Sequence, residues 1–145
     1  MTRRTLVRLA LTMSYFRRHA VGRTDDPYVV IVHPSNTFDA LSRSRVAFLF
    51  LRRVSRWPFG AEVVPVDLSK PQRVRLEFLA QVLRTTEEQL SEYWIDQRVT
   101  RGVSPPVQLS NTAALKAFVA ARPGAIGYIP PADLDSTVKV LRVDP

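Results

Sequence analysis

The apolar positions of this chain form short continuous runs separated by stretches with helical spacing. The β-branched run over residues 28–32 predicts a strand buried on both faces. Residues 62–68 predict a second strand, in which Pro65 cannot donate a ladder hydrogen bond and so indicates an edge strand or a bulge. The run over 125–129 predicts a third strand, and the alternating segment 137–143 predicts a fourth.

Helices are predicted between these strands. Residues 42–53 mix polar and apolar side chains at helical spacing, and the segment 57–60 ends that helix. Ser69 and Gln72 have the spacing of a capping box, in which the hydroxyl accepts from a backbone amide and the Gln side chain reaches back. This spacing predicts a second helix that begins after Ser69.

The same capping pattern recurs at Thr86, ahead of a helix predicted over 87–99. Its inward side chains are predicted to be Leu90, Trp94 and Ile95. Ser110 is predicted to cap a fourth helix. The element order predicts an α/β fold, a small mixed sheet flanked by helices, in a single domain over residues 27–145.

Charge is divided unevenly along the chain. The 145 residues carry 21 Lys and Arg against 13 Asp and Glu, a net charge of +8. Residues 1–24 hold six arginines and no acid, so the rest of the chain is close to neutral. Three interpretations of the basic tail over 1–26 stay open: a disordered or fraying helix, a degenerate export signal, or an arm for nucleic acid or anionic membrane. The near-neutral body makes a nucleic-acid partner the weaker expectation.

Several classes of chemistry lack their residues. The chain has no Cys, which excludes a disulfide framework, a thiol nucleophile and a cysteine-based metal site. The longest apolar run, 46–51, is far shorter than the roughly 20 residues of a membrane span. His33 is expected to be a turn residue, and no metal-ligand or nucleophile motif is present. We therefore expect neither an enzyme nor a metal site nor a cofactor.

One segment carries the residues of an anion site. At a predicted strand-to-helix junction, Ser69 offers a hydroxyl, Lys70, Arg73 and Arg75 offer cations, and Gln72 lies between them. Free amides at a helix start attract anions, which makes these five residues the candidate anion-binding set. The alternative is that Ser69 only caps the helix and the arginines are solvated.

Residues 30–128 resemble the carboxyl-side lobe of the phosphate-binding, substrate-capturing proteins of ABC transporters. The most specific match is the run Pro123-Gly-Ala-Ile-Gly-Tyr-Ile129. The matching segments, in chain order, are 40–46, 50–51, 57–58, 64–66, 75–78, 89–94, 101–106 and 123–129.

This resemblance implies one lobe of a type II periplasmic-binding-protein-like fold. In that family two lobes close around phosphate, and the exported protein passes its ligand to ABC permease subunits. The chain has the length of about one lobe. It also lacks the family's Ser-Gly-Thr phosphate loop, since those positions are residues 72–74 here and only Arg75 matches. The arginine that the family places before the loop falls at residues 67–68, where this chain has none.

These observations lead to one functional expectation and one alternative. The chain is expected to be a phosphate ABC-transporter substrate-binding-like protein that binds phosphate or a similar oxyanion, with that binding weak or lost. Its expected partners are ABC permease subunits or another protein chain, and its expected location is periplasmic or otherwise exported, with a cytoplasmic location as the alternative. The alternative function is an accessory protein-interaction domain that kept the fold without the ligand.

Overall fold

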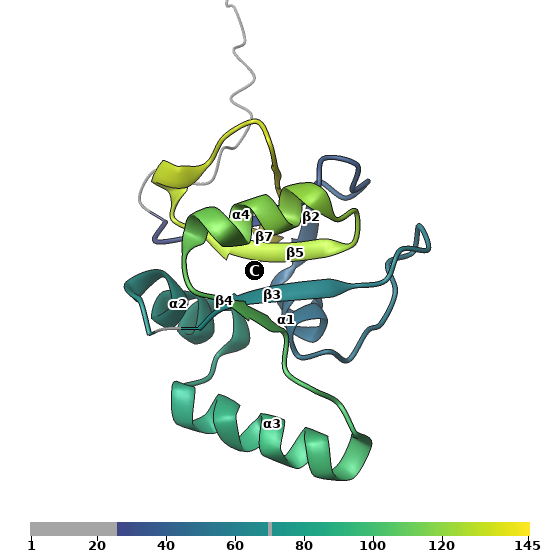
Figure 1. The fold of residues 1–145 in the computed structure, drawn as a ribbon, viewed down its shortest axis with the longest axis vertical. Helices are drawn as coiled ribbons and strands as arrows, with labels where there is room; N and C mark the ends of the chain where they lie inside the picture. The colour runs from purple at the N-terminus through teal and green to yellow at the C-terminus, as the bar shows by residue number, and fades with distance from the viewer. Residues whose placement is uncertain (1–25, 70) are drawn as a thin grey trace, which may run out of the picture.

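A mixed five-stranded sheet with the order β4-β3-β5-β1-β6 is the centre of the fold (Figure 1). The computed structural model describes residues 26–69 and 71–145. The strands of this sheet are β1 (Val29–Val32), β3 (Val64–Leu68), β4 (Val107–Leu109), β5 (Ala125–Ile129) and β6 (Lys139–Val140). Strand β3 runs parallel to β4 and β5, whereas β1 is antiparallel to β5 and β6. The predicted α/β fold with a small mixed sheet is confirmed.

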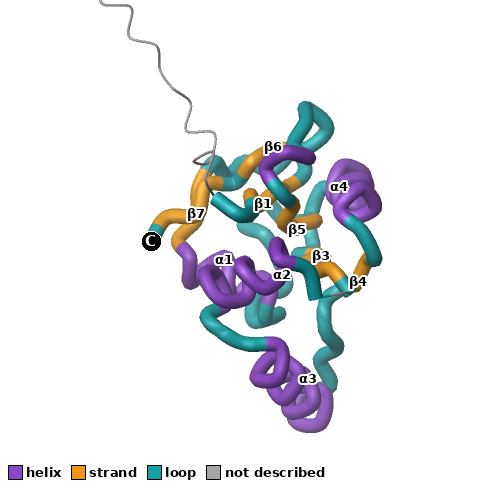
Figure 2. The backbone as a smooth tube through the Cα atoms, turned by 90° about the vertical axis from the view of Figure 1, so that its left-hand side faces the viewer, coloured by secondary structure: helices purple, strands orange, loops and turns teal. Residues whose placement is uncertain are grey.

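Helices cover both faces of this sheet, with α4 on one side and α1 and α2 on the other (Figures 1 and 2). The helical segments are α1 (Arg43–Phe50), α2 (Arg73–Phe78), the π-helical η1 (Leu79–Leu83), α3 (Glu87–Arg101), α4 (Thr112–Ala121) and the 3₁₀ turn η2 (Pro131–Asp133). Within the described residues, no helix has the length and apolar character needed to cross a bilayer. The predicted tail over 1–26 lies outside the described residues except for Asp26.

The two faces of β5 show why helices pack on both sides. Gly127 faces α4, where a Cβ atom would lie 2.6 Å from Leu115 Cδ2. The next side chain, Tyr128, points to the opposite face, as alternation along a strand requires. Its ring stacks on Phe78 of α2 with centroids 4.1 Å apart, and Phe50 of α1 lies 4.7 Å from the Phe78 ring. An aromatic layer therefore fills the space between the sheet and the α1–α2 side.

The turn before β5 needs glycine because the backbone of another segment lies against it. A Cβ atom on Gly124 would lie 1.8 Å from the carbonyl oxygen of Glu62. The carbonyl of Gly124 also accepts from the buried indole Nε1 of Trp57 at 2.9 Å. These contacts give a structural reason for glycine in the most specific segment of the resemblance.

The prediction that Pro65 marks an edge strand is wrong, because β3 lies between β4 and β5. The amide of Val64 donates to Gly124 O on the β5 side at 2.9 Å. Backbone groups alternate along a strand, so the nitrogen of Pro65 faces the β4 side. Pairing with β4 begins only at Val66. The missing N–H therefore falls where the ladder has no partner for it.

The predicted capping box of Ser69 and Gln72 is also wrong. Helix α2 begins at Arg73, and its N-cap is Gln72, which makes no side-chain cap hydrogen bond. A helix starting after Ser69 would need helical geometry at the residue before Pro71, and proline disfavours that conformation in the residue preceding it. The proline thus moves the start of the helix along the chain.

Of the other two predicted helix caps, one is confirmed and one is wrong. The capping box of Thr86 and Gln89 is confirmed at the start of α3. Helix α4 is capped by Asn111, whose Oδ1 accepts from the amide of Ala114 at 2.8 Å, and not by Ser110 as predicted. Both residue types are good caps, so the sequence left the position uncertain by one residue.

The predicted fourth strand divides into two. Strand β6 pairs with β1, and the chain then crosses to form β7 (Arg142–Asp144), which pairs in parallel with β2 (Ala40–Ser42) in a separate small sheet. Leu141 at the crossing is buried, and its amide donates to Val30 O at 2.9 Å. Strands β2 and β4, each of three residues, were not predicted.

Helix α3 is set apart from the sheet in Figure 1. The Tyr93 hydroxyl ties it to the body by donating to Leu51 O at 2.9 Å. Of the predicted inward set, Leu90 is buried and Trp94 is half-buried. The prediction for Ile95 is wrong, because its side chain is 65% exposed. Helix α3 therefore exposes apolar side chains to solvent on one face.

Candidate functional site

The buried guanidinium of Arg75 lies between two carboxylates that come from different elements. Its Nη1 donates to Asp67 Oδ2 and, at 3.0 Å, to Leu68 O. Its Nε donates to Glu87 Oε1 at 2.6 Å, and its Nη2 donates to Glu87 Oε2 at 2.9 Å. The Arg75 side chain is only 7% exposed, so these bonds form largely out of contact with water.

The fold places these groups at the ends of three elements. Asp67 is next to last in β3, Arg75 lies in the first turn of α2, and Glu87 is the first residue of α3. Asp67 Oδ1 accepts from the Tyr128 hydroxyl on β5 and from the Leu68 amide at 2.8 Å. We call Asp67, Arg75, Glu87 and Tyr128 the Arg75 cluster.

Three members of the Arg75 cluster have pKa values that the cluster itself shifts. Burial opposes the charge of Arg75 most strongly, yet the hydrogen bonds to Glu87 and Asp67 outweigh it, so its pKa is raised. The hydrogen bond from Arg75 lowers the pKa of Glu87. Burial, followed by the nearby Asp67 charge, raises the pKa of Tyr128, which keeps its phenol protonated as a donor. Two acidic residues stand against one arginine in the cluster, so its formal charge is one negative.

A cleft of about 650 Å³ opens between the Arg75 cluster and α3, and we call it the α3 cleft. Its polar lining comes from Asp67, Arg75, Glu87, Ser91, Arg98 and Gln108. Its apolar lining comes from Leu90, Trp94, Ile95, Val99, Pro105 and Pro106. This mixture of apolar side chains with a few charged and polar groups is typical of sites for small molecules.

The two carboxylate partners of Arg75 differ in how firmly they are held. The Asp67 side chain is 10% exposed, whereas the Glu87 side chain is 36% exposed. Glu87 takes the paired Nε and Nη2 donors in the bidentate arrangement that guanidinium groups offer to any carboxylate or phosphate. An oxyanion from solution would therefore compete with Glu87 for the same two donors.

The structure does not gather the predicted anion-binding set at one point. Of the four members that the structure describes, only Arg75 lines the α3 cleft. Arg73 is exposed and lines a different depression beside Glu77. Ser69 is exposed, and its amide donates to Leu109 O at 2.9 Å. Gln72 is the half-buried N-cap of α2. Lys70 lies outside the described residues.

Sequence reasoning missed the acidic partners of Arg75. Asp67 was visible as a charge within an otherwise apolar strand, and buried charges are almost always paired. Glu87 was hidden because an acid in the first turn of a helix is already explained by the helix dipole. The contact of Arg75 with Glu87 crosses the turn between η1 and α3 and leaves no local pattern.

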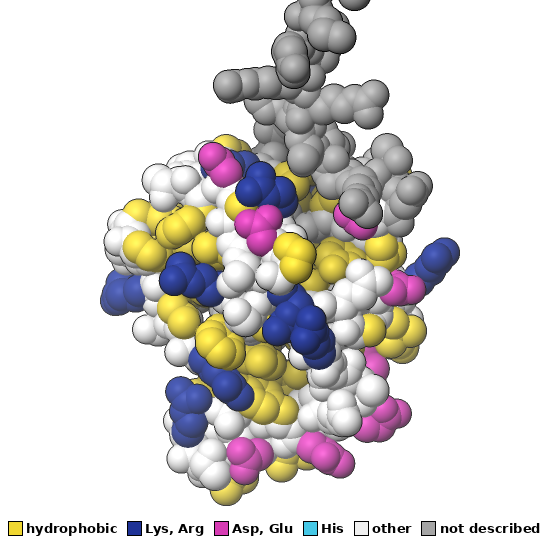
Figure 3. Space-filling view, turned by 180° about the vertical axis from the view of Figure 1, so that it is seen from behind, with side chains coloured by type: hydrophobic (Ala, Val, Ile, Leu, Met, Phe, Trp, Pro, Cys, Tyr) yellow, Lys and Arg dark blue, Asp and Glu magenta, His cyan; other side chains and the backbone are white. Residues whose placement is uncertain are grey.

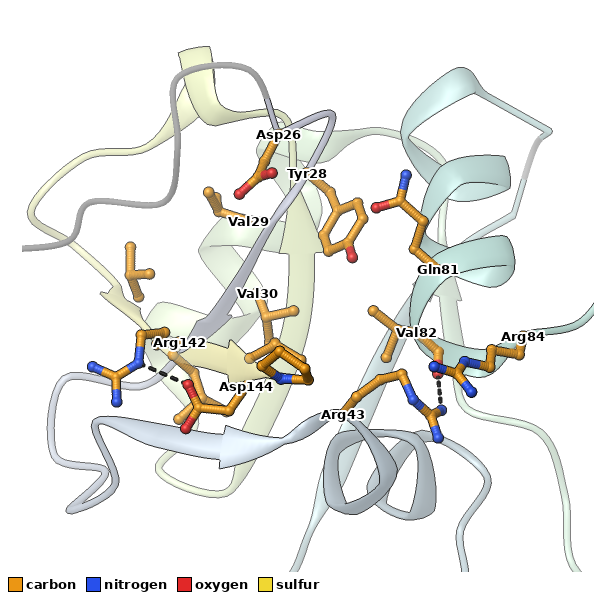
Figure 4. A pocket seen from close by; sticks show the side chains of 14 residues that line it. Asp26, Tyr28, Val29, Val30, Arg43, Gln81, Val82, Arg84, Arg142 and Asp144 are labelled. Carbon is orange, nitrogen blue, oxygen red and sulfur yellow. Dashed lines mark hydrogen bonds and ion pairs between the residues drawn. The ribbon is translucent and has the colours of Figure 1, made fainter.

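A second, smaller pocket of about 350 Å³ lies beside β1 and η1, where three arginines approach it (Figure 4). Arg142 Nε donates to Asp144 Oδ1 at 2.9 Å, and Arg43 Nη1 donates to Val82 O at 2.8 Å. Arg84 is exposed. Two of the three cations are thus already engaged, and no buried charged group points into this pocket.

Residues 26–69 and 71–145 contain no group of three or more His, Asp or Glu side chains that could hold a metal ion.

The fold is that of known phosphate receptors. No family model matches this chain, and no curated protein matches it. An ABC-type phosphate transport receptor from Vibrio cholerae superposes with a TM-score of 0.65 at 16% identity, over 81% of this chain and 46% of the receptor. A phosphate ABC transporter substrate-binding protein from Clostridium perfringens, solved with bound phosphate, gives 0.65 at 18% identity, over 81% and 45%.

The protein PstS from Borrelia burgdorferi gives a TM-score of 0.61 at 12% identity, over 81% of this chain and 47% of that protein. This chain therefore spans about half the length of the receptors that it matches. The expected fold, equivalent to one lobe of such a receptor, is confirmed.

Proposed function

We propose that this chain is an oxyanion-binding lobe of the phosphate-receptor type, in which the Nε and Nη2 donors of Arg75 bind the ligand. The observation that carries the proposal is the buried Arg75 guanidinium, which lines the α3 cleft and whose two parallel donors are held by the partly exposed Glu87. Paired donors of this geometry match the two oxygens of a phosphate or a similar oxyanion. The shared fold and the match of Arg75 to the receptors' motif support the same function.

Each member of the Arg75 cluster has a role in this proposal. Asp67, fixed by Tyr128 and the Leu68 amide, holds the guanidinium in place whether or not a ligand is bound. Glu87 occupies the paired donors when the ligand is absent. An incoming oxyanion displaces Glu87, and the displaced carboxylate stays close to it as a like charge. Binding is therefore weak, because the cluster is negative overall and the cleft is open to water, which screens charge.

We further propose that the domain over 27–145 works outside the cytoplasm, with the tail over 1–26 as its export signal and ABC permease subunits as its partners. This part of the proposal comes from the resemblance and from the receptors that share the fold. Fractionation of cells, with the mass of the mature protein, tests it. A full-length mass in the cytoplasmic fraction would contradict it.

Calorimetric titration with inorganic phosphate and with sulfate tests the binding proposal. We expect weak heat with the wild-type protein and tighter binding with Glu87→Gln, by roughly fivefold, since the competing ion pair is worth about 1 kcal/mol or less. Arg75→Lys keeps a cation next to Asp67 but loses the paired donors, so binding should disappear. Arg73→Ala is the matched control and should bind like the wild type. Absence of heat in the wild type and in Glu87→Gln would overturn the proposal.

The second candidate is an accessory protein-interaction domain that kept the fold and lost the ligand. The exposed apolar residues of α3 favour it, because Ile95 is 65% and Val99 is 81% exposed. A pull-down with wild-type protein and with Ile95→Ser/Val99→Ser separates the two functions. Recovery of the same nonspecific proteins by both would count against this candidate.

A further inference from the structure

We propose that the α3 cleft takes an organic oxyanion, a phosphonate or phosphate monoester with an apolar or aromatic substituent, in preference to inorganic phosphate. The inference rests on the proposed binding at Arg75 and names the class of ligand. The cleft volume of about 650 Å³ is within the range of sites for small organic molecules. Inorganic phosphate has five non-hydrogen atoms and would leave most of this space to water.

Half of the residues that line the α3 cleft are apolar. Among them, Leu90 is buried and Trp94 is half-buried. Pro106 is buried as well. A tetrahedral oxyanion without an organic substituent has no apolar group to pack against these side chains. A ligand with an apolar body would cover them and gain the free energy of removing apolar surface from water.

Arg98 is a second cation in the lining of the α3 cleft. It lies four residues after Trp94, which places both side chains on one face of α3. Within the described residues, Arg98 makes no ion pair and no side-chain hydrogen bond. The acids of α3 outside the cluster (Glu88, Glu92 and Asp96) do not line the cleft. Apart from Glu87, the charged residue that α3 contributes to the cleft is therefore a cation, beside apolar side chains.

The surface around α3 carries both charged and apolar side chains. Figure 3 shows hydrophobic side chains on the face opposite that of Figure 1, with acidic side chains below them at the end where α3 lies. Within the α3 cleft, Arg75 and Arg98 are the cationic lining residues, and the ring of Trp94 offers a face for an aromatic substituent.

Titration of the full chain with inorganic phosphate, methylphosphonate and phenylphosphonate tests the inference. We expect phenylphosphonate to bind about tenfold or more tightly than inorganic phosphate, because an aromatic ring is removed from water. Methylphosphonate should fall between them. Trp94→Ala should remove most of this advantage and leave the affinity for inorganic phosphate within about twofold of the wild type. Phe48→Ala, at an exposed aromatic outside the cleft, is the control and should change neither affinity.

Val99→Ser is a second test variant in case Trp94→Ala does not fold. The Val99 side chain is 81% exposed and lines the cleft, so its substitution should leave the fold intact. This variant should weaken phenylphosphonate binding and not phosphate binding. Equal affinities for phosphate and phenylphosphonate would overturn this inference and leave the proposed function standing. A phenylphosphonate advantage that survives both Trp94→Ala and Val99→Ser would also overturn it. Absence of binding by all three ligands in the wild type and in Glu87→Gln would overturn the proposed function as well.

Discussion

Arg75 and Glu87 are joined by two parallel hydrogen bonds, of 2.6 Å from Nε to Oε1 and 2.9 Å from Nη2 to Oε2. The pair fastens the start of α3 to α2, and the Tyr93 hydroxyl makes a second attachment farther along the helix. Elsewhere α3 contributes little to the core, with Leu90 as its one buried residue. The same pair closes the paired donors of Arg75 to solution, so the position of α3 and access to the site are linked.

This link predicts a pH dependence. Arg75 lowers the pKa of Glu87 below its ordinary value of 4.5. The contribution of the pair to the free energy of unfolding is therefore fully present above the unfolded-state pKa, and it is lost as the pH falls through the lower folded-state pKa. Thermal unfolding between pH 7 and pH 3 should show wild type above Glu87→Gln at neutral pH, with the difference vanishing in acid. A difference that stays constant down to pH 3 would contradict this role for Glu87.

Substituting either partner of the hydrogen bond between Tyr128 and Asp67 should lower the free energy of unfolding. Tyr128→Phe removes a buried donor to a carboxylate, which typically costs about 1.5–3 kcal/mol. Asp67→Asn breaks the buried ion pair with Arg75 and should cost about 3 kcal/mol or more. Urea denaturation measures both values. Tyr93→Phe, which loses a half-buried bond to a carbonyl, should cost about 1 kcal/mol. Wild-type stability in Asp67→Asn would show that the pair does not stabilise the fold.

The N-terminus of α4 gives a prediction that separates two neighbouring residues. Asn111 accepts from the amide of Ala114, whereas the Ser110 side chain makes no cap bond to the helix. Asn111→Ala should cost about 1 kcal/mol of unfolding free energy, and Ser110→Ala should change it by less than about 0.5 kcal/mol. Chemical denaturation of the two variants measures both changes. Equal losses of unfolding free energy would contradict the assignment of Asn111 as the cap of α4.

The sequence predicted the parts of the fold that rest on local patterns. The continuous run of β1 and the Pro-Gly segment before β5 were recognisable, because burial on both faces and a close backbone contact each restrict the residue types. The edges were not. Strands β2 and β4 are too short for a periodic pattern, and Pro65 was compatible with an inner strand only because β4 pairs beyond it.

Of the five predicted anion-binding residues, four lie in the described part of the chain, and Arg75 is the one of these four that lines the α3 cleft. Arg75 was identified from the basic residues at the strand-to-helix junction and again from the resemblance, but its proposed function depends on Asp67 and Glu87, which reach it from other elements. The exposure of Ile95 could not be predicted either, since an amphipathic pattern assumes that a core lies against the helix. Helix α3 has such a neighbour over only part of its length.

The most direct test of the account follows the Arg75 side chain itself during a phosphate titration. The hydrogen-bonded Nε–H of Arg75 should give a resolved ¹⁵N–¹H signal, assigned by its absence in Arg75→Lys. The account predicts that phosphate shifts this signal in the wild type, and that the shift saturates at lower phosphate concentration in Glu87→Gln. A signal that stays in place in both proteins, up to the highest phosphate concentration, would contradict the claim that Arg75 is the anion-binding group.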